Sequence, residues 1–244
     1  MALLEIKNVS KRFGGLKAIS DVSFDVVEEQ MTFIVGPNGA GKTTLFNMIT
    51  GVYNPDGGHI VYKGEDITHI APAKAAKIGI GRTFQIVKPL RNLTVLENVM
   101  LGAFLHTNSP SKAADEALEV LKFLEMDKVA HLPARGMGLP MLKRLEIARA
   151  LATKPKLMLL DEVVAGLPTS EALKLAKILK RLPEWGIAGV GGVEHVMQVV
   201  MAISDRVVVL DHGVKIAEGK PDDVVHRPEV IEAYLGPKYK ELFG

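Results

Sequence analysis

Apolar and polar residues alternate with a period of two through much of the first 35 residues. The alternating apolar positions are Leu4, Ile6, Val22, Phe24 and Val26. A period of two is typical of strands with one buried face. We therefore predict β-strands that are interrupted by turns at Gly14 and Gly15 and at residues 28–30.

A short, mostly apolar run at Met31–Val35 lacks this alternation. Such a run favours a strand that is buried on both faces. A helix is predicted over residues 43–50, because Gly51 and Pro55 then provide a stop. Residues 59–64 predict a further short hairpin.

Apolar residues recur every three or four positions from about residue 95 to residue 153, which predicts helices. Ser109 and Pro110 form a helix start, with a capping hydroxyl and a proline at the first helical position. A loop is predicted over residues 133–140. The expected apolar face of the helix before this loop is Ala114, Ala117, Leu118, Leu121 and Leu124, and that of the helix after it is Leu142, Leu145, Ala148 and Leu151.

After Pro155 the pattern returns to alternating strands and helices. Strands are predicted at 157–160, 187–193 and 207–210, and helices at 170–182 and 195–203. This alternation predicts a parallel sheet with crossover helices. The fold class is therefore an α/β core over residues 1–88 and 156–244, with an N-terminal antiparallel β subdomain and an inserted helical lobe over residues 89–155.

The composition excludes several classes of protein. The 244 residues carry 30 basic and 28 acidic side chains without a block of like charge, which argues against a nucleic-acid-binding arm. The absence of cysteine excludes a disulfide scaffold and a zinc–thiolate site, and fits a reducing compartment. Neither a signal peptide nor an apolar run approaching the roughly 20 residues of a membrane span is present. We expect a soluble chain that reaches a membrane only through a partner.

Residues 36–43, GPNGAGKT, match the pattern G-x-x-x-x-G-K-[ST] between the predicted strand and helix. Glycines allow the backbone N–H groups of such a loop to surround phosphate oxygens, and the following helix N-terminus favours negative charge. Lys42 is expected to reach the β- and γ-phosphates, and the Thr43 hydroxyl to bind Mg²⁺. The candidate nucleotide-binding residues of this Walker A loop are Gly36, Pro37, Asn38, Gly39, Ala40, Gly41, Lys42, Thr43 and Thr44.

Two acidic residues end the predicted strand over residues 157–160. Asp161 is expected to bind Mg²⁺, directly or through water, and Glu162 to polarise the attacking water. An apolar run ending in Asp-Glu is weak support alone, but it complements the phosphate loop. Together the two motifs predict binding and hydrolysis of ATP with Mg²⁺.

The two motifs and the residues around them resemble the nucleotide-binding subunit of an ABC transporter over essentially the whole chain. The fold that this resemblance implies is the P-loop NTPase core of the ABC type. It further implies that Phe13 stacks on adenine and that Gln85 contacts Mg²⁺ or the lytic water. It also implies that His195 contacts the γ-phosphate.

Within that family the chain is most similar to the ATPases of branched-chain amino-acid importers. The stretches that carry this likeness are residues 82–85, 92–103, 194–219 and 228–236. The resemblance implies that transmembrane permease subunits and a second ATPase subunit are partners, and that nucleic acid is not. It places the chain in the cytoplasm, on the inner face of the cell membrane. The transported solute is chosen by other subunits.

The signature loop departs from the family pattern LSGGQ, which closes the ATP site of the opposite subunit. The corresponding residues run from Met137 to Met141 and place Gly138, Leu139 and Pro140 where the family has serine and two glycines. Proline has no N–H to donate, although it suits a helix start. Pro168 replaces an aspartate, and glycines within residues 189–192 should weaken a strand. Either this half is degenerate and pairs with a better subunit, or it is a working variant.

Three alternatives to a transport ATPase remain open from the sequence. A non-transport ABC ATPase would use the same dimer, although such proteins commonly carry two cassettes or long insertions. A nucleotide-gated binding module with negligible turnover would fit the unusual signature loop. A small-molecule kinase would not require His195 after its own strand.

Overall fold

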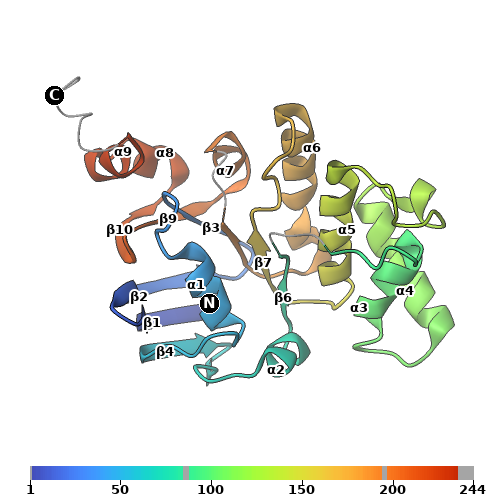
Figure 1. Ribbon diagram of the computed structural model, residues 1–244, viewed down its shortest axis with the longest axis horizontal. Helices are drawn as coiled ribbons and strands as arrows, with labels where there is room; N and C mark the ends of the chain where they lie inside the picture. Colours follow the sequence, from blue (N-terminus) through green and yellow to red (C-terminus); the bar gives the residue numbers. More distant parts are fainter. Residues whose placement is uncertain (1, 85–87, 194–196, 236–244) are drawn as a thin grey trace.

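The computed structural model describes residues 2–84, 88–193 and 197–235. Its first part is an antiparallel sheet with the strand order β2-β1-β4-β5 (Figure 1). The bounds of these strands are Ala2–Phe13 for β1, Leu16–Val27 for β2, Gly57–Tyr62 for β4 and Glu65–Asp66 for β5. The predicted N-terminal strands and their turn at Gly14 and Gly15 are confirmed.

A second sheet forms the centre of the molecule, with the strand order β10-β9-β3-β8-β7-β6. Adjacent strands from β9 to β6 run parallel, and β10 is antiparallel to β9. The predicted parallel sheet is therefore confirmed. The bounds are Met31–Val35 for β3, Ile80–Arg82 for β6, Leu157–Asp161 for β7, Val190–Val193 for β8, Arg206–Asp211 for β9 and Val214–Gly219 for β10.

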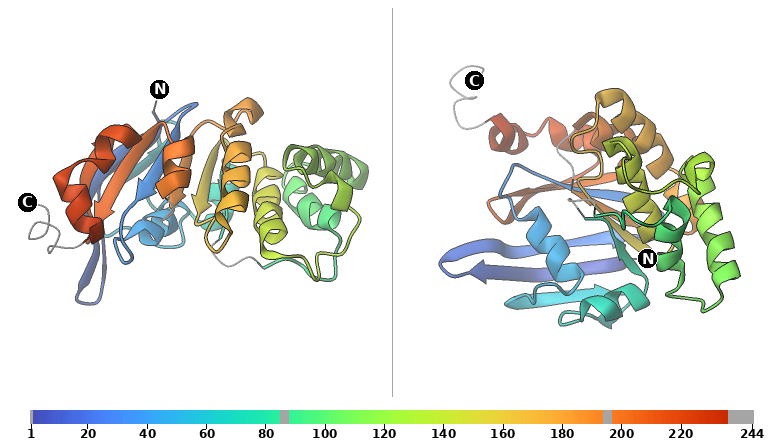
Figure 2. Two further views of the ribbon diagram at one scale, coloured as in Figure 1. Left: turned by 90° about the horizontal axis from the view of Figure 1, so that it is seen from above. Right: turned by 45° about the vertical axis from the view of Figure 1, so that its right-hand side comes forward.

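Helices surround the central sheet, and α3, α4 and α5 gather at one end of the molecule (Figure 2). None of the helices in the described ranges is long and apolar enough to cross a membrane. The bounds are Lys42–Ile49 for α1, Pro72–Lys77 for α2, Val95–Ala103 for α3, Pro110–Phe123 for α4, Leu139–Leu151 for α5, Thr169–Leu179 for α6, Met197–Ile203 for α7, Pro221–Val225 for α8 and Pro228–Leu235 for α9; short 3₁₀ turns span Asp127–Val129 and Leu182–Trp185.

Several predicted boundaries were wrong. The loop expected up to residue 140 ends earlier, because α5 begins at Leu139 and accommodates Pro140 in its first turn. The helix expected to run to residue 182 ends at Leu179, and a 3₁₀ turn follows. The strand expected from residue 187 begins at Val190, because Gly189 has the positive φ of +88° and interrupts extended backbone.

Helix α4 begins as predicted, because the Ser109 side chain accepts a hydrogen bond from the N–H of Lys112 and Pro110 occupies the first turn. Three of the five residues predicted for its apolar face, Ala117, Leu121 and Leu124, are buried. Ala114 and Leu118 are only half-buried. The buried residues of the helix are Ala113, Ala117, Val120, Leu121 and Phe123.

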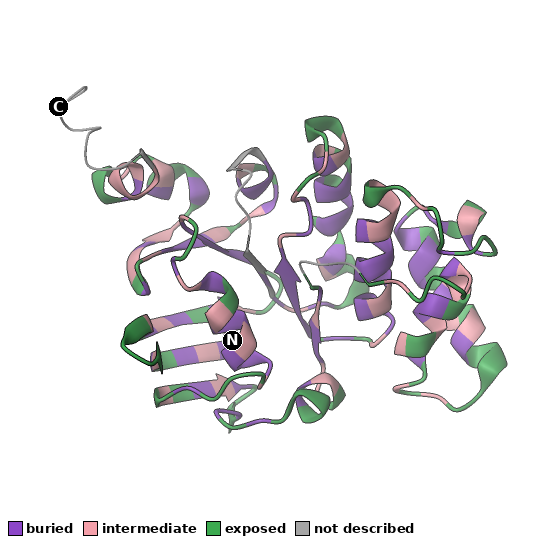
Figure 3. Cartoon of the chain, viewed as in Figure 1, coloured by how far each residue is buried: buried purple, intermediate pink, exposed green. Residues whose placement is uncertain are grey.

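The central strands are buried on both faces, as the run at Met31–Val35 predicted (Figure 3). Phe33 and Val35 belong to the core that packs against α5 and α6, whereas Ile34 belongs to the core that contains Phe46 of α1. Burial of two opposite faces explains why these strands lack a polar alternation.

Gly191, which should weaken β8, lies where α1 packs on the sheet. A Cβ atom at this position would lie 3.5 Å from the Phe46 ring and 3.2 Å from the Leu159 side chain. The distance to Phe46 is an ordinary van der Waals contact, whereas the Leu159 side chain would have to shift by a few tenths of an ångström. Gly191, a residue type that weakens strands, thus lies at the point of β8 where α1 packs closely on the sheet.

We predict that Thr94→Ala destabilises the helical end of the molecule by about 1 kcal/mol. The Thr94 side chain accepts the Glu97 N–H at 3.1 Å, and the Glu97 carboxylate accepts the Thr94 N–H at 2.7 Å, so the two residues form a capping box at the start of α3. The free energy of unfolding, measured in urea, checks the prediction. Thr94→Ser keeps the hydroxyl and is the control, and equal stability of the two variants would contradict this role.

Candidate functional site

The phosphate loop connects β3 to α1, as the sequence predicted. Two of its positions require glycine, because the backbone has a positive φ there and a neighbouring carbonyl oxygen leaves no space for a Cβ atom. Gly36 has φ of +149°, and a Cβ atom there would lie 2.0 Å from the Leu210 carbonyl oxygen. Gly41 has φ of +98°, and its Cβ would lie 2.5 Å from the Ala18 carbonyl oxygen. The loop therefore fits against its neighbours only with glycine at both positions.

Lys42 is buried at the start of α1 and points back into the loop. Its Nζ donates hydrogen bonds to the carbonyl oxygens of Gly36 at 2.6 Å and Pro37 at 2.9 Å. Burial lowers the pKa of Lys42, and the carboxylates of Glu162 and Asp161 oppose this shift. The lysine is thus held at the centre of the loop, near both acidic residues.

A cavity of about 410 Å³ joins the phosphate loop to Phe13 and Glu162. Phe13 is 42% exposed, and its ring packs edge-on against Tyr53 with the centroids 5.2 Å apart. The structure therefore brings together residues predicted from three separate parts of the chain. Residues of this lining that the sequence analysis did not predict are Leu16, Lys17, Ala18 and His212, which belong to no recognised motif.

A second cavity, of about 400 Å³, is lined by two of the residues predicted to bind the metal, Thr43 and Asp161. Glu146 also lines it, and burial raises the pKa of this carboxyl while Arg149 opposes the shift. The remaining lining residues are Arg82, Phe84, Lys88 and Arg149.

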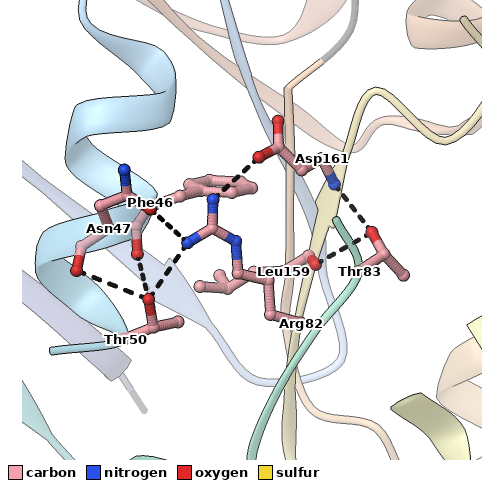
Figure 4. A network of polar contacts seen from close by, with 7 residues as sticks. All are labelled: Phe46, Asn47, Thr50, Arg82, Thr83, Leu159 and Asp161. Carbon is pink, nitrogen blue, oxygen red and sulfur yellow. Dashed lines mark hydrogen bonds and ion pairs between the residues drawn. The ribbon is translucent and has the colours of Figure 1, made fainter. Parts of the chain in front are cut away.

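Asp161 is a buried carboxylate at the end of β7, only 2% exposed (Figure 4). Its Oδ2 accepts a hydrogen bond from the Arg82 guanidinium at 2.9 Å, and its buried Oδ1 has no hydrogen-bond partner among the described residues. Burial raises the pKa of Asp161, whereas the hydrogen bond from Arg82 lowers it. No role was predicted for Arg82, because its partner Asp161 lies 79 residues away in the sequence.

An unpartnered carboxylate oxygen and a nearby threonine hydroxyl fit Mg²⁺, which prefers oxygen ligands. The described residues contain no cluster of three or more acidic or imidazole side chains that would form an all-protein metal cage. Mg²⁺ in proteins is commonly bound by one or two carboxylates together with substrate phosphates. Thr43 and Asp161 beside a phosphate loop match that arrangement.

Glu162 follows Asp161 in a strained backbone conformation. Its φ is +49°, in the left-handed region that residues other than glycine rarely adopt. Its carbonyl oxygen accepts a hydrogen bond of 2.8 Å from the Lys143 ammonium, which comes from α5. Lys143 was not predicted as a site residue, and its position in the chain gives no signal of this contact.

The unusual signature segment lies at the start of α5. Gly138 is the N-cap residue in extended conformation, without a capping side chain, and Leu139 and Pro140 form the first turn. Leu139 is 42% exposed. These residues line neither of the two cavities. Pro168 occupies the N-cap position of α6.

Two predicted site residues, Gln85 and His195, lie outside the described residues. The first follows Phe84, whose side chain is exposed beside the second cavity, and the second follows β8 in the sequence. Their expected contacts with the metal, the water or the γ-phosphate remain predictions.

Comparisons with known proteins identify the family of the chain. Residues 19–165 match the family model described as ABC transporter, and residues 214–236 match the one described as branched-chain amino acid ATP-binding cassette transporter. The chain is 36% identical to the high-affinity branched-chain amino acid transport ATP-binding protein BraF of Pseudomonas aeruginosa, over 96% of this chain and 98% of that one.

Two solved structures show the same fold. An ATP-binding cassette of an ABC transporter in its ADP conformation has a TM-score of 0.88 and 34% identity, covering 97% of this chain and 99% of that one. A bacterial ABC transporter cassette solved as a dimer has a TM-score of 0.80 and 29% identity, covering 89% and 98%.

We predict that Gly36→Ala destabilises the protein by on the order of 3 kcal/mol, because the new methyl group overlaps the Leu210 carbonyl oxygen. Gly39→Ala is the matched control in the same loop. Gly39 has φ of +81° but open space around its Cβ position, so only the left-handed backbone costs free energy, about 1–2 kcal/mol. Denaturant unfolding of both variants measures the difference, and equal losses would refute the steric explanation.

Proposed function

The chain belongs to the ABC transporter family, and on that basis we propose that it binds and hydrolyses ATP to power solute import through a separate membrane permease. The observation that carries this proposal is the cavity in which the phosphate loop, Phe13 and Glu162 meet. The chain would act on the cytoplasmic face of the cell membrane, which it would reach through the permease.

The residues of the cavity suit successive parts of the nucleotide. The exposed ring of Phe13 would stack on adenine. Backbone N–H groups of the loop and the N-terminus of α1 would bind the phosphates, and Lys42 would exchange its carbonyl partners for phosphate oxygens. Glu162 would accept a proton from the attacking water. Gln85 and His195 would complete the site as the family resemblance implies.

Thr43 and the free Oδ1 of Asp161 would hold Mg²⁺. The ion would neutralise charge that develops on the phosphates during hydrolysis. The support for this assignment is the chemistry of the two side chains and their shared cavity.

A second subunit would close the ATP site, as in the family. The N–H groups of Gly138 and Leu139 lie at the start of α5, where the helix dipole favours phosphate. Pro140 adds no donor, so this signature segment offers fewer hydrogen bonds than LSGGQ. A homodimer with a working variant and a heterodimer with a second, better signature are both compatible with these residues.

We further propose that the helical lobe over residues 89–155 moves against the core over residues 1–88 and 156–244 and transmits this motion to the permease. The chain has a cavity of about 260 Å³ between these parts, lined by Val52, Phe84 and Arg149 among others. Apolar side chains line it together with the charged residues Arg82, Glu146 and Arg149, and this mixed lining suits an amphipathic helical segment of a membrane partner. The solute class proposed from the relatives is branched-chain amino acids.

Glu162→Gln should lower the rate of ATP hydrolysis by about 10²- to 10⁴-fold and leave ATP binding intact, because only the proton acceptor is lost. The Mg²⁺-dependent ATPase rate of the purified chain, measured against protein concentration, tests this. A rate that rises faster than linearly would indicate a working homodimer. Tight ATP binding without turnover in the unmodified chain would indicate that a different subunit supplies the signature.

Lys42→Ala should weaken ATP binding by about 10- to 150-fold, the equivalent of a hydrogen bond to a charged group worth about 1.5–3 kcal/mol. Lys174→Ala is the control, since this lysine lies exposed on α6 and pairs with Glu171. Equilibrium titration with a fluorescent ATP analogue measures both. Unchanged binding in Lys42→Ala would reject the proposed nucleotide site.

Co-purification separates transport from the other ABC activities. A tagged chain should recover hydrophobic subunits from detergent-solubilised membranes. Recovery of soluble or nucleic-acid partners alone would favour a non-transport ABC ATPase.

A further inference from the structure

Arg82 and Thr83, which lie three and two residues before Gln85 in the sequence, make polar contacts with the side chain and the backbone of Asp161 (Figure 4). The backbone N–H of Asp161 donates to the Thr83 hydroxyl at 3.0 Å, and the N–H of Thr83 donates to the Leu159 carbonyl at 3.0 Å. Arg82 donates to Oδ2 of Asp161 at 2.9 Å. This network fixes both the backbone and the side chain of the carboxylate.

Arg82 is itself held from several sides. One guanidinium nitrogen donates to Asn47 Oδ1, on α1, at 2.6 Å and to Oγ1 of Thr50, the C-cap residue of α1, at 3.2 Å. The guanidinium carbon lies 5.8 Å from the Phe46 ring centroid and 5.3 Å from that of Phe84. With its side chain only 7% exposed, the arginine cannot turn toward water without breaking these contacts.

The ion pair between Arg82 and Asp161 uses only one carboxylate oxygen. Arginine commonly binds a carboxylate through two parallel hydrogen bonds, which would occupy both oxygens. Here the second nitrogen points to α1 instead, and the Nε of Arg82 has no hydrogen-bond partner in the part of the chain that the structure describes. Oδ1 of Asp161 points away from the guanidinium (Figure 4), and no described residue forms a hydrogen bond with it.

We propose that Arg82 is a positioning residue for the metal site: it holds Asp161 by Oδ2, balances its charge, and so presents Oδ1 to Mg²⁺. This proposal rests on the function proposed above. Residues that orient a metal-binding carboxylate through hydrogen bonds commonly affect metal affinity as much as the ligands do. Because Arg82 also binds α1, it ties the metal-binding strand to the helix that follows the phosphate loop.

Arg82→Met should raise the Mg²⁺ concentration required for half-maximal enhancement of nucleotide binding by about 10- to 100-fold. Without the guanidinium, both oxygens of a buried carboxylate lack a partner and its orientation is no longer fixed. Binding of a fluorescent ATP analogue in EDTA should stay unchanged, because the phosphate loop does not require Arg82. The titration uses a Glu162→Gln background so that no ATP is consumed.

Arg206→Met is the matched control. Arg206 pairs with Glu218 and donates to the Asp25 carbonyl oxygen, away from both cavities. Arg206→Met should leave the Mg²⁺ concentration for half-maximal enhancement of nucleotide binding unchanged. A shift of similar size in this variant would attribute the effect to general destabilisation and overturn the proposal.

Two milder variants test the proposal even if Arg82→Met does not fold. Arg82→Lys keeps the charge but cannot bridge Asp161 and α1 through a planar fork. Asn47→Ala removes one of the contacts that hold the arginine on α1. Both should shift the Mg²⁺ requirement in the same direction by a smaller factor. Wild-type Mg²⁺ dependence in both, or tighter Mg²⁺ binding in Arg82→Met, would overturn the positioning role.

The unmodified chain distinguishes failure of this inference from failure of the proposed function. If it binds the ATP analogue without any enhancement by Mg²⁺, the assignment of the metal site itself fails. If Mg²⁺ enhances binding equally in the unmodified chain and in Arg82→Met, only the role of Arg82 is wrong.

Discussion

The parallel register of β3, β8, β7 and β6 is the constraint on which the site depends. Parallel strands end at the same edge of a sheet, so the phosphate loop after β3 and the acidic residues at the end of β7 are brought to one side. Arg82 ends β6, the strand next to β7, and therefore lies beside Asp161. Because β3 and β7 are buried on both faces, the groups at their ends cannot move independently of the core.

The site contains buried charged side chains and a residue with strained backbone. Each of these residues forms a hydrogen bond or an ion pair with a specific neighbour. Lys42 is removed from water and donates to two carbonyl oxygens of its own loop. Asp161 has a guanidinium on one side. Glu162 is held in a left-handed conformation while its carbonyl accepts the Lys143 ammonium. Buried charges without partners would neutralise or destabilise the fold, so these partners allow the chemistry to be placed in a sheltered edge of the sheet.

Prediction from sequence succeeded where local backbone requirements decide the outcome. The turn between β1 and β2, the strand β3 and the capped start of α4 follow from periodicity, glycine and capping chemistry. It failed where an element is short or lacks periodicity: β6 has three residues, and β10 has only one buried residue. The predicted loop over residues 133–140 includes Pro140, which the structure has in the first turn of α5, where a missing N–H costs no helical hydrogen bond.

The sequence by itself determined the phosphate loop, because its glycines, Lys42 and Thr43 are consecutive and their roles depend on local dihedral angles and the helix that follows. It also located the acidic end of β7. Only the tertiary structure decided which basic side chains contact Asp161 and Glu162. Arg82 lies 79 residues from Asp161, and Lys143 lies 19 residues from Glu162 on a different element. Such contacts follow from strand order and helix packing, which bring distant segments together without leaving a periodic signal along the chain.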